Sequence, residues 1–481
     1  MKRPSLFCGL LLFLIGAYCT PVEAKVFFRV VASPVPPADK TGIQDLVLTW
    51  PLPDSSAIAQ LRSQGYHVWL QCESKDFTDA VTAAERVRAT GVIVASAANS
   101  GESTIIEEIR SHTASRKDMA FRILIPGGKQ PQMKGRLVVE RNGVLQVSSP
   151  STQPWLDTNL AIVRLAQAIY PASISTLYDF HWDTSEAPAG AWKPDAEDYA
   201  LAIAEADADR SDAIIDLPAA LQKALAEDNS QAWALWKRVM MYISFSLRTP
   251  MDNASPIGSI GVIVDDTRTD YEPANLMARH NLSFEAIQPS ALTVARLGAW
   301  NSAVVFCPVN NEALAMLRDF ATKGGIVIFV NPHQEFPWHS AAPNSREAHS
   351  STYTIGSGQI VELGEPVIDP ENFARDIRRL IGPERSSITL WNSLTTLVTG
   401  YRKEDRHEMM LYLVNYADQP DNVQVQVKGH YTQVRWESPE VTCCALLPFV
   451  ERDGFTEFTI PTLRIAARVH LEFGAKSTTV H

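Results

Sequence analysis

Residues 25 to about 250 alternate short apolar runs with longer helix-like runs, and this alternation limits the fold most strongly. Helix-like runs such as SSAIAQLRSQG and FTDAVTAAERVRAT lie between the strand-like ones. Strands separated by helices form a parallel sheet. About eight such units in roughly 225 residues suit a closed barrel. The strand-like runs include VFFRVV, DLVLTW, YHVWLQCE, GVIVASA, FRILIP, STLYDF and DAIIDL.

The count of about eight units includes one strand from a predicted hairpin. The run LVVERNGVLQVSS turns at Asn142-Gly143, a dipeptide typical of two-residue hairpin turns. We assign its second arm as a barrel strand. Residues 25–250 are therefore expected to form a (β/α)8 TIM-like barrel, and a doubly wound open sheet is the alternative.

Two further domains follow a predicted linker, RTPMDNASPIG at residues 248–258. Residues 257–385 again alternate strands and helices, with SIGVIVDD, LSFEAI, SAVVFC and GGIVIFVN as the strands. From residue 386 to 474 the apolar residues recur every second position, as in EMMLYLVNY and VQVQVKG. This period predicts an antiparallel β-sandwich. The chain is expected to be a multidomain α/β protein.

Residues 1–24 have the pattern of an export signal. Lys2 and Arg3 precede an apolar core that is too short for a confident membrane span. Val22 and Ala24 occupy the small-residue positions of a cleavage site. We expect a mature chain that begins near Lys25 and is secreted or periplasmic; an uncleaved anchor is the alternative. We expect no membrane partner after signal cleavage.

Composition restricts the class of partner. The chain is 46% hydrophobic and 20% charged, which is ordinary for a globular protein, and its formal net charge is -11. No run of Lys or Arg interrupts this acidic balance. Nucleic acid and anionic membrane are therefore excluded as expected partners. Neutral small molecules, neutral polymers and other proteins remain open.

Cysteine is too sparse for a disulfide framework. Of the 6 cysteines, Cys8 and Cys19 belong to the signal. The adjacent Cys443 and Cys444 are expected to be packed free thiols, with a vicinal disulfide or a metal site as the alternatives. No His or Cys grouping has zinc spacing, so neither a metal nor a cofactor is expected.

Acidic and aromatic residues follow several predicted barrel strands, where barrel active sites lie. The densest group is YDFHWDTSE at residues 178–186. Glycoside cleavage requires two carboxyl groups across the scissile bond, and aromatic rings stack on the apolar faces of sugars. The candidate catalytic residues are Asp183, Glu73, Asp179 and Asp216. The candidate substrate-binding residues are Trp50, Trp182, His181 and Asn99.

Several of these candidates also have a purely structural interpretation. Asp216 precedes Pro218 and is expected to cap the helix that begins there. Glu73 would cap or solvate the next helix, and Asp179 would be an inward polar group with satisfied hydrogen bonds. The two tryptophans are equally well explained as core residues.

The middle domain carries a pattern, SIGVIVDD…ANLMARHNLSFEAI…SAVVFCPVN…LRDFATKGGIVIFV, that resembles the class I glutamine-amidotransferase-like fold. The sandwich carries YLVNYADQPDNVQVQVKG. In this order the three domains resemble secreted glycoside hydrolases built like family 42 β-galactosidases. The resemblance implies a carbohydrate substrate. It also implies that the middle domain is an inert assembly module through which the protein forms a homo-oligomer.

The sequence departs from both families at their catalytic motifs. The resemblance implies an acid/base Glu directly after an Asn that follows the fourth barrel strand. Here Asn99 is followed by Ser100, so no role is carried over to Glu102. Cys307 in VVFCPVN lacks the flanking glycines of a nucleophile turn, so glutaminase activity is not expected. The expected function is glycoside hydrolysis, and a non-catalytic carbohydrate-binding or assembly protein on the same scaffold is the alternative.

Overall fold

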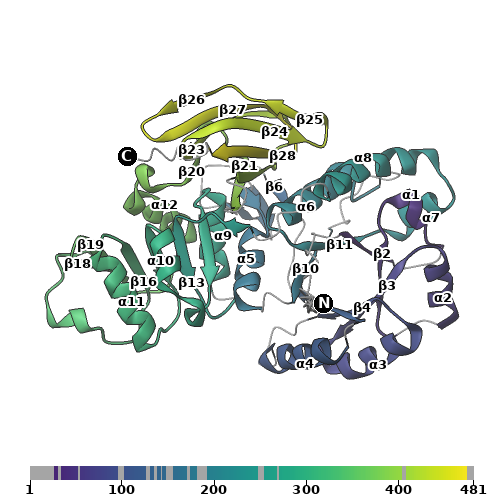
Figure 1. The fold of residues 1–481 in the computed structure, drawn as a ribbon, viewed down its shortest axis with the longest axis horizontal. Coiled ribbons are helices and arrows are strands. Elements are labelled where there is room, and N and C mark those ends of the chain that lie inside the picture. The colour runs from purple at the N-terminus through teal and green to yellow at the C-terminus, as the bar shows by residue number, and fades with distance from the viewer. Residues whose placement is uncertain are drawn as a thin grey trace, which may run out of the picture.

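A computed structural model of the chain describes most of the sequence in three parts: a barrel, a mixed sheet with helices, and a β-sandwich (Figure 1). The described residues are 26–30, 34–51, 55–95, 102–116, 118–125, 131–134, 138–141, 144–147, 155–170, 174–180, 182, 192–247, 254–267, 270–403 and 408–473. The predicted export signal lies outside them.

The first part is a closed barrel of parallel strands, which confirms the predicted fold class. Around the ring the order is β1, β11, β10, β5, β4, β3 and β2. Their bounds are β1 Val26–Arg29, β2 Asp45–Thr49, β3 His67–Glu73, β4 Gly91–Ala95, β5 Ala120–Ile125, β10 Ser175–Asp179 and β11 Asp212–Asp216.

The barrel has 7 strands among the described residues, not the expected eight. The predicted hairpin forms, as β7 (Val138–Arg141) and β8 (Val144–Val147), with Arg141 opposite Val144. Its second arm is not a barrel strand, however, because β10 pairs directly with β5. A ring strand has only two neighbours, and β5 already has β4 and β10. A second small sheet pairs β6 (Gln132–Lys134) with β9 (Trp155–Asp157).

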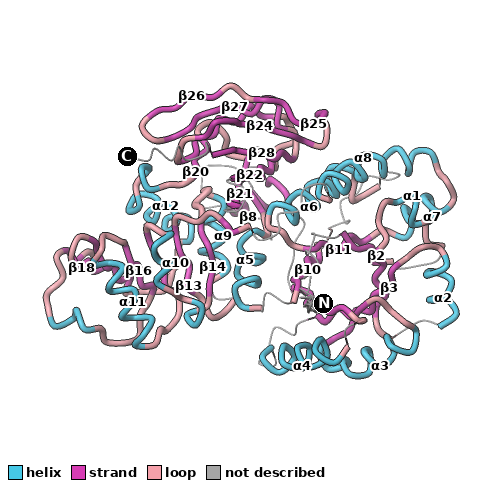
Figure 2. Tube along the Cα trace, in the orientation of Figure 1, coloured by secondary structure: helices cyan, strands magenta, loops and turns pink. Residues whose placement is uncertain are grey.

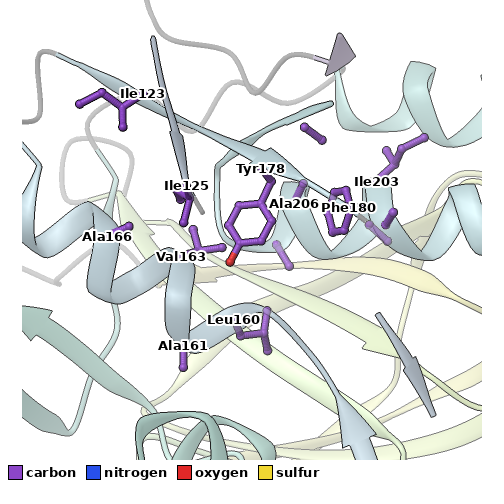
Figure 3. Close-up of a cluster of buried hydrophobic side chains, with 14 of the residues drawn as sticks. Ile123, Ile125, Leu160, Ala161, Val163, Ala166, Tyr178, Phe180, Ile203 and Ala206 are labelled. Atoms are coloured by element: carbon purple, nitrogen blue, oxygen red, sulfur yellow. The ribbon is translucent and has the colours of Figure 1, made fainter. Parts of the chain in front are cut away.

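Helices surround the outside of the barrel (Figure 2). Their apolar faces pack on the outward side chains of the strands. The close-up of one such region shows Tyr178 of β10 among side chains of β5, α5 and α6, with its hydroxyl donating to the Asn159 carbonyl at 2.8 Å (Figure 3). The helices are α1 Ala38–Thr41, α2 Ser55–Ser63, α3 Phe77–Val87, α4 Glu102–Ser115, α5 Leu160–Ile169, α6 Ala196–Ala208, α7 Ala219–Ala226 and α8 Ser230–Ser246.

The second part is a sheet in the order β14, β13, β15, β16, β19, β18, β17. The first five strands are parallel to one another. β18 pairs antiparallel with β19, and β17 pairs antiparallel with β18. The predicted strands are confirmed as β13 Ile260–Ile263, β14 Phe284–Ile287, β15 Ser302–Val305 and β16 Ile326–Val330, followed by β17 Ser345–Arg346, β18 Ser350–Ile355 and β19 Gly358–Leu363. The helices of this part are α9 Tyr271–Arg279, α10 Val294–Ala299, α11 Asn311–Thr322 and α12 Pro370–Ile381.

The third part is the predicted antiparallel sandwich. A sheet in the order β12, β21, β22, β28, β24, β25 faces a second sheet in the order β20, β23, β27, β26. The end of the expected linker forms β12 (Ser255–Pro256), which pairs with β21. The other strands are β20 Ile388–Leu390, β21 Thr396–Lys403, β22 Glu408–Asn415, β23 Asp421–Lys428, β24 Tyr431–Ser438, β25 Val441–Leu446, β26 Phe449–Arg452, β27 Phe455–Leu463 and β28 Ala466–Phe473.

The end of α6 joins the barrel to the sandwich. Asp207 accepts from the Arg468 guanidinium of β28 at 2.7 Å, and Glu205 accepts from the Tyr416 hydroxyl. The Tyr401 hydroxyl of β21 donates to the Ala208 carbonyl at 2.9 Å. Arg468 is fully buried. The parts are therefore held together by buried polar contacts as well as by apolar packing.

The cysteines depart in part from expectation. Cys444 is disulfide-bonded, so the prediction of two free thiols is wrong for this residue. Cys72 and Cys307 are free and buried. Within the described ranges, no helix is long and apolar enough to cross a membrane.

Candidate active site

The barrel interior is filled by one apolar layer, to which each strand contributes one side chain. Because strand residues alternate between faces, the next inward residue of a strand lies two positions further along. The barrel is therefore packed rather than open, and its chemistry is confined to the ends. The layer consists of Phe27, Val47, Trp69, Ile93, Leu124, Leu177 and Ile214.

A polar layer lies one inward step nearer the C-terminal ends of the strands. Arg29, Gln71, Asp179 and Asp216 each stand two residues after a member of the apolar layer. Arg29 also lies directly opposite Asp216 in the pairing of β1 with β11. The C-terminal mouth of the barrel thus carries a cation, two carboxylates and an amide that point toward the axis.

Arg29 is the centre of this layer. Its guanidinium donates to both oxygens of Asp179, from Nη1 at 2.8 Å and from Nη2 at 2.7 Å. Nη1 also donates to Asp216 Oδ1 at 3.1 Å. Nε and Nη2 donate to Gln71 Oε1 at 3.1 and 2.8 Å. The bidentate contact with Asp179 fixes the plane of the guanidinium.

The electrostatics follow from this arrangement. Desolvation by burial acts to lower the pKa of Arg29, but the hydrogen bonds and the attraction of Asp179 and Asp216 outweigh it, so the pKa is raised from its usual value. The Asp179 side chain is 10% exposed and that of Asp216 is 31% exposed. Asp216 is therefore the carboxylate that solvent or a ligand reaches more easily.

The two carboxylates lie close together. Both accept from Arg29 Nη1, at 2.8 and 3.1 Å, so their nearest oxygens are no more than about 6 Å apart. A separation of roughly 5–5.5 Å is typical of the carboxyl pair in retaining glycosidases. Asp179 and Asp216 are two of the four candidate catalytic residues predicted from the sequence, and the structure brings these two together.

Glu73 lies at the rim of the mouth. It is the last residue of β3 and is exposed. It stands two residues after Gln71, hence on the same side of the strand and one step further out. Glu73 occupies the N-cap position of the short 3-10 helix Ser74–Asp76, but its exposed side chain makes no cap hydrogen bond, and Asp76 is the N-cap residue of α3.

The capping interpretation of Asp216 is also wrong. Pro218, not Asp216, is the N-cap of α7, and no side chain caps that helix. The inward direction of Asp216 explains this difference: its side chain follows the strand alternation into the mouth and meets Arg29 rather than the amides of α7.

The two candidate tryptophans, Trp50 and Trp182, pack against other side chains and do not present an open ring face for a sugar. Trp50 is half-buried, packs against the core between strands and helices, and donates its backbone N–H to the Gln71 carbonyl at 2.7 Å. The Trp182 ring lies 5.0 Å from that of Tyr199 in α6, whose hydroxyl donates to the Asp216 carbonyl at 2.9 Å. Trp182 therefore supports the wall beneath Asp216. Asp183, His181 and Asn99 lie outside the described residues.

Sequence reasoning missed Arg29 and Gln71. Their signal was their position: each follows an inward apolar residue by two places near the end of a predicted strand. The missing step was the choice of face, which only closure of the ring settles. At the opposite end, Trp69 Nε1 donates to Asp45 at 2.7 Å and Arg122 pairs with Asp212 at 2.9 Å. This end of the barrel is closed by buried pairs.

In the middle part, Cys307 is not an activated nucleophile. Desolvation by burial, together with Asp265 and Asp270, raises the pKa of its thiol to about 12. The parallel sheet was predicted correctly, whereas kinship with class I amidotransferases stays a prediction.

A closed parallel barrel with carboxylates at its C-terminal mouth and a β-sandwich near the C-terminus is a glycoside-hydrolase-like fold. Solved structures share it. α-L-Fucosidase isoenzyme 2 from Paenibacillus thiaminolyticus matches with a TM-score of 0.59 and 11% identity, over 94% of this chain and 100% of that one. This likeness shows the fold and not the substrate.

More distant matches include two β-galactosidases. Gan42B, a GH42 β-galactosidase from G. stearothermophilus, gives a TM-score of 0.46 and 8% identity, over 88% of this chain and 70% of that one. The β-galactosidase from Bacillus circulans sp. alkalophilus gives 0.40 and 9%, over 87% and 66%. No family model matches the sequence, and no curated protein matches it significantly.

Proposed function

We propose that the chain is an exported carbohydrate-active protein that hydrolyses glycosides at the barrel mouth. The observation that carries the proposal is that Asp216, a partly exposed carboxylate held by Arg29, and Glu73 at the rim both lie at the C-terminal mouth of the barrel. The glycoside-hydrolase-like fold supports the same substrate class.

The residues divide the chemistry as follows. Asp216, the more exposed carboxylate, attacks the anomeric carbon and forms a glycosyl ester. Glu73 at the rim donates the proton to the leaving oxygen and then takes a proton from the water that cleaves the ester. Asp179 holds Arg29, and Arg29 positions Asp216. No cofactor takes part in these steps.

A screen against chromogenic glycosides tests this function. Asp216→Asn and Glu73→Gln keep the shape of the side chains but remove the nucleophile or the acid, so hydrolysis should fall about 10²–10⁴-fold. Asp228→Asn, at an exposed side chain that follows α7 and pairs with Lys40, is the matched control and should keep full activity. Wild-type protein that cleaves no glycoside in the screen would overturn the proposal.

A non-catalytic carbohydrate-binding role on the same scaffold is the second candidate. The observation that favours it is that Arg29 already binds both carboxylates, as a structural ion pair would. Wild-type protein that binds glycans without cleaving any would select this function.

We further propose export to the periplasm or the exterior, because residues 1–24 combine a basic start, an apolar core and a small-residue exit. The mature protein should begin near Lys25. Terminal sequencing that finds Met1 retained would contradict this. The absence of a basic run supports the proposal that neither nucleic acid nor anionic membrane is a partner.

The middle part is proposed to be an amidotransferase-like module that serves assembly into a homo-oligomer. Its support is the sequence pattern and the buried Cys307. Cys307→Ala should leave glycoside hydrolysis unchanged, and the wild type should release no ammonia from glutamine. Light scattering that finds only monomers would contradict the assembly role.

A further inference from the structure

The smaller sheet of the sandwich turns one face inward and one outward. Val423, Val425 and Val427 of β23 are buried, as are Phe458 and Ile460 of β27. The alternate residues must therefore point away from the sandwich core. Figure 1 shows β26 and β27 on the side of the sandwich away from the barrel.

One row across this outer face combines an indole with uncharged polar side chains. Trp391 directly follows β20, and its backbone N–H donates to the Gln424 carbonyl at 3.1 Å. Gln424 in turn pairs with Thr459 of β27. Ile388 of β20 is buried, so alternation directs Thr389 and Trp391 outward. The Trp391 side chain is 61% exposed, and Gln424 and Thr459 are exposed as well.

The loop that carries Trp391 is fixed to the sheet. Asn392 donates from Nδ2 to the Asn422 carbonyl at 2.6 Å and accepts from the Gln424 N–H at 2.8 Å. Ser393 Oγ accepts from the Thr396 N–H at 3.2 Å. A loop held in place in this way loses little backbone freedom when a ligand covers the side chain that it carries.

The row of Trp391, Gln424 and Thr459 carries no charge. In the next row the Glu457 carboxylate accepts a hydrogen bond from Gln426 Nε2 at 2.9 Å. Lys428 and Arg452 lie toward the other end of the strands. An uncharged, hydroxyl-rich ligand is the class that this row complements.

We infer that this face binds a neutral polysaccharide chain. One sugar ring lies on the Trp391 indole, which covers the apolar ring C–H surface. The amide of Gln424 and the hydroxyl of Thr459 then meet the hydroxyls of the chain. The site is separate from the barrel mouth and has no catalytic group; it holds the polymer to the protein.

A second copy of this chain is a poorer occupant. The exposed large apolar side chains of the described β20–β21 loop are Trp391 and Leu394. A specific protein interface buries about 800 Å² on each partner with an apolar centre. These two side chains, with Val450 of β26 as a further exposed apolar side chain on this sheet, stand beside an amide-rich row and do not supply such a centre.

The test is affinity electrophoresis of wild-type protein through gels that contain single soluble polysaccharides, neutral ones and the anionic alginate. We expect retardation by at least one neutral polysaccharide. Trp391→Ala should weaken that binding about tenfold or more, since stacking is lost, while Trp391→Phe should keep part of it. Ile368→Ala, at an exposed apolar side chain of the middle part, is the control and should bind as the wild type.

Several results would overturn the inference: no retardation by any neutral polymer, unchanged binding by Trp391→Ala, retardation by alginate alone, or an oligomer that Trp391→Ala dissociates. The melting temperature of Trp391→Ala should match the wild type because the side chain is exposed. Hydrolysis at the barrel mouth and polysaccharide binding on the sandwich are tested by separate variants. Trp391→Ala should keep cleavage of short glycosides, and Asp216→Asn should keep retardation in the gel.

Discussion

Asp179 and Asp216 share one arginine but differ in burial, and this difference predicts unequal roles in stability. Asp179→Ala leaves the largely buried Arg29 without its bidentate partner and should cost about 3 kcal/mol of unfolding free energy. Asp216→Ala removes a more exposed partner and should cost roughly 1 kcal/mol or less. Denaturant unfolding of both variants measures the two values. Equal losses would show that the two aspartates hold Arg29 equally.

At the scale of single residues, the sequence predicted which residue types lie in the barrel mouth but not which side chains bond to one another. Asp179 and Asp216 were identified because they end strands. Arg29 was not, since a cation inside a barrel mouth is explained only by carboxylates about 150 and 190 positions away in the chain. The capping role of Asp216 failed for the same reason: a local rule competed with a distant ion pair.

The N-terminus of α6 carries a capping box. Asp195 accepts from the backbone N–H groups of Glu197 and Asp198, and the Asp198 side chain accepts from the Asp195 N–H, which completes a capping box. Asp195→Ala should therefore lower the unfolding free energy by about 1 kcal/mol. Asp195→Asn keeps the acceptor and should lose less. Thermal or denaturant unfolding of the pair checks the order, and a larger loss in the asparagine variant would contradict it.

His470 of β28 lies between two acidic side chains of neighbouring strands. Burial acts to lower its pKa, but hydrogen bonds with Glu408 at 2.7 Å and Glu437 at 3.4 Å outweigh this, so the pKa is raised from its usual value. The group therefore contributes its full stability below the ordinary histidine pKa and loses it as the pH rises through the raised value.

The corresponding experiment compares wild type with His470→Gln by denaturant unfolding across pH 5 to 9. The difference in unfolding free energy should be largest at the acidic end and shrink toward the alkaline end. A difference that grows with pH would mean that the imidazole is held neutral. His430→Gln, at an exposed pair with Glu451, is the matched control and should change the unfolding free energy little.

Elements were predicted well where periodicity was strong. The strands of the middle sheet and the sandwich follow their patterns, and the predicted hairpin is confirmed by the pairing of β7 with β8. The prediction that the second arm of this hairpin is a barrel strand was wrong, because a run of β-forming residues specifies a strand but not the strands with which it pairs. Ring closure through β5 and β10 is a matter of long-range register, which a local pattern does not contain.

Arg468 decides how firmly the barrel and the sandwich hold together. It is fully buried, bonds to Asp207 of α6 and lies 4.2 Å above the Phe245 ring of α8. Arg468→Met leaves Asp207 buried without its guanidinium and should cost about 3–5 kcal/mol. Arg435→Met removes a surface pair with Glu472 and should cost no more than about 1 kcal/mol. Denaturant unfolding measures both. A small loss in the first variant would show that apolar packing alone holds the two parts.

At the end of α6, the association of the barrel with the sandwich is coupled to the uptake of a proton. Desolvation by burial raises the pKa of Glu205 to about 8, although the Tyr416 hydroxyl of the sandwich and the Asn159 N–H both donate to it. A separated barrel would expose this carboxyl to water, where it ionises near its ordinary value. At neutral pH the molecule with barrel and sandwich in contact therefore holds about one proton more than the separated parts. Mild acid shifts the equilibrium toward association of the two parts. Calorimetry in buffers of different ionisation enthalpy would register that proton as heat.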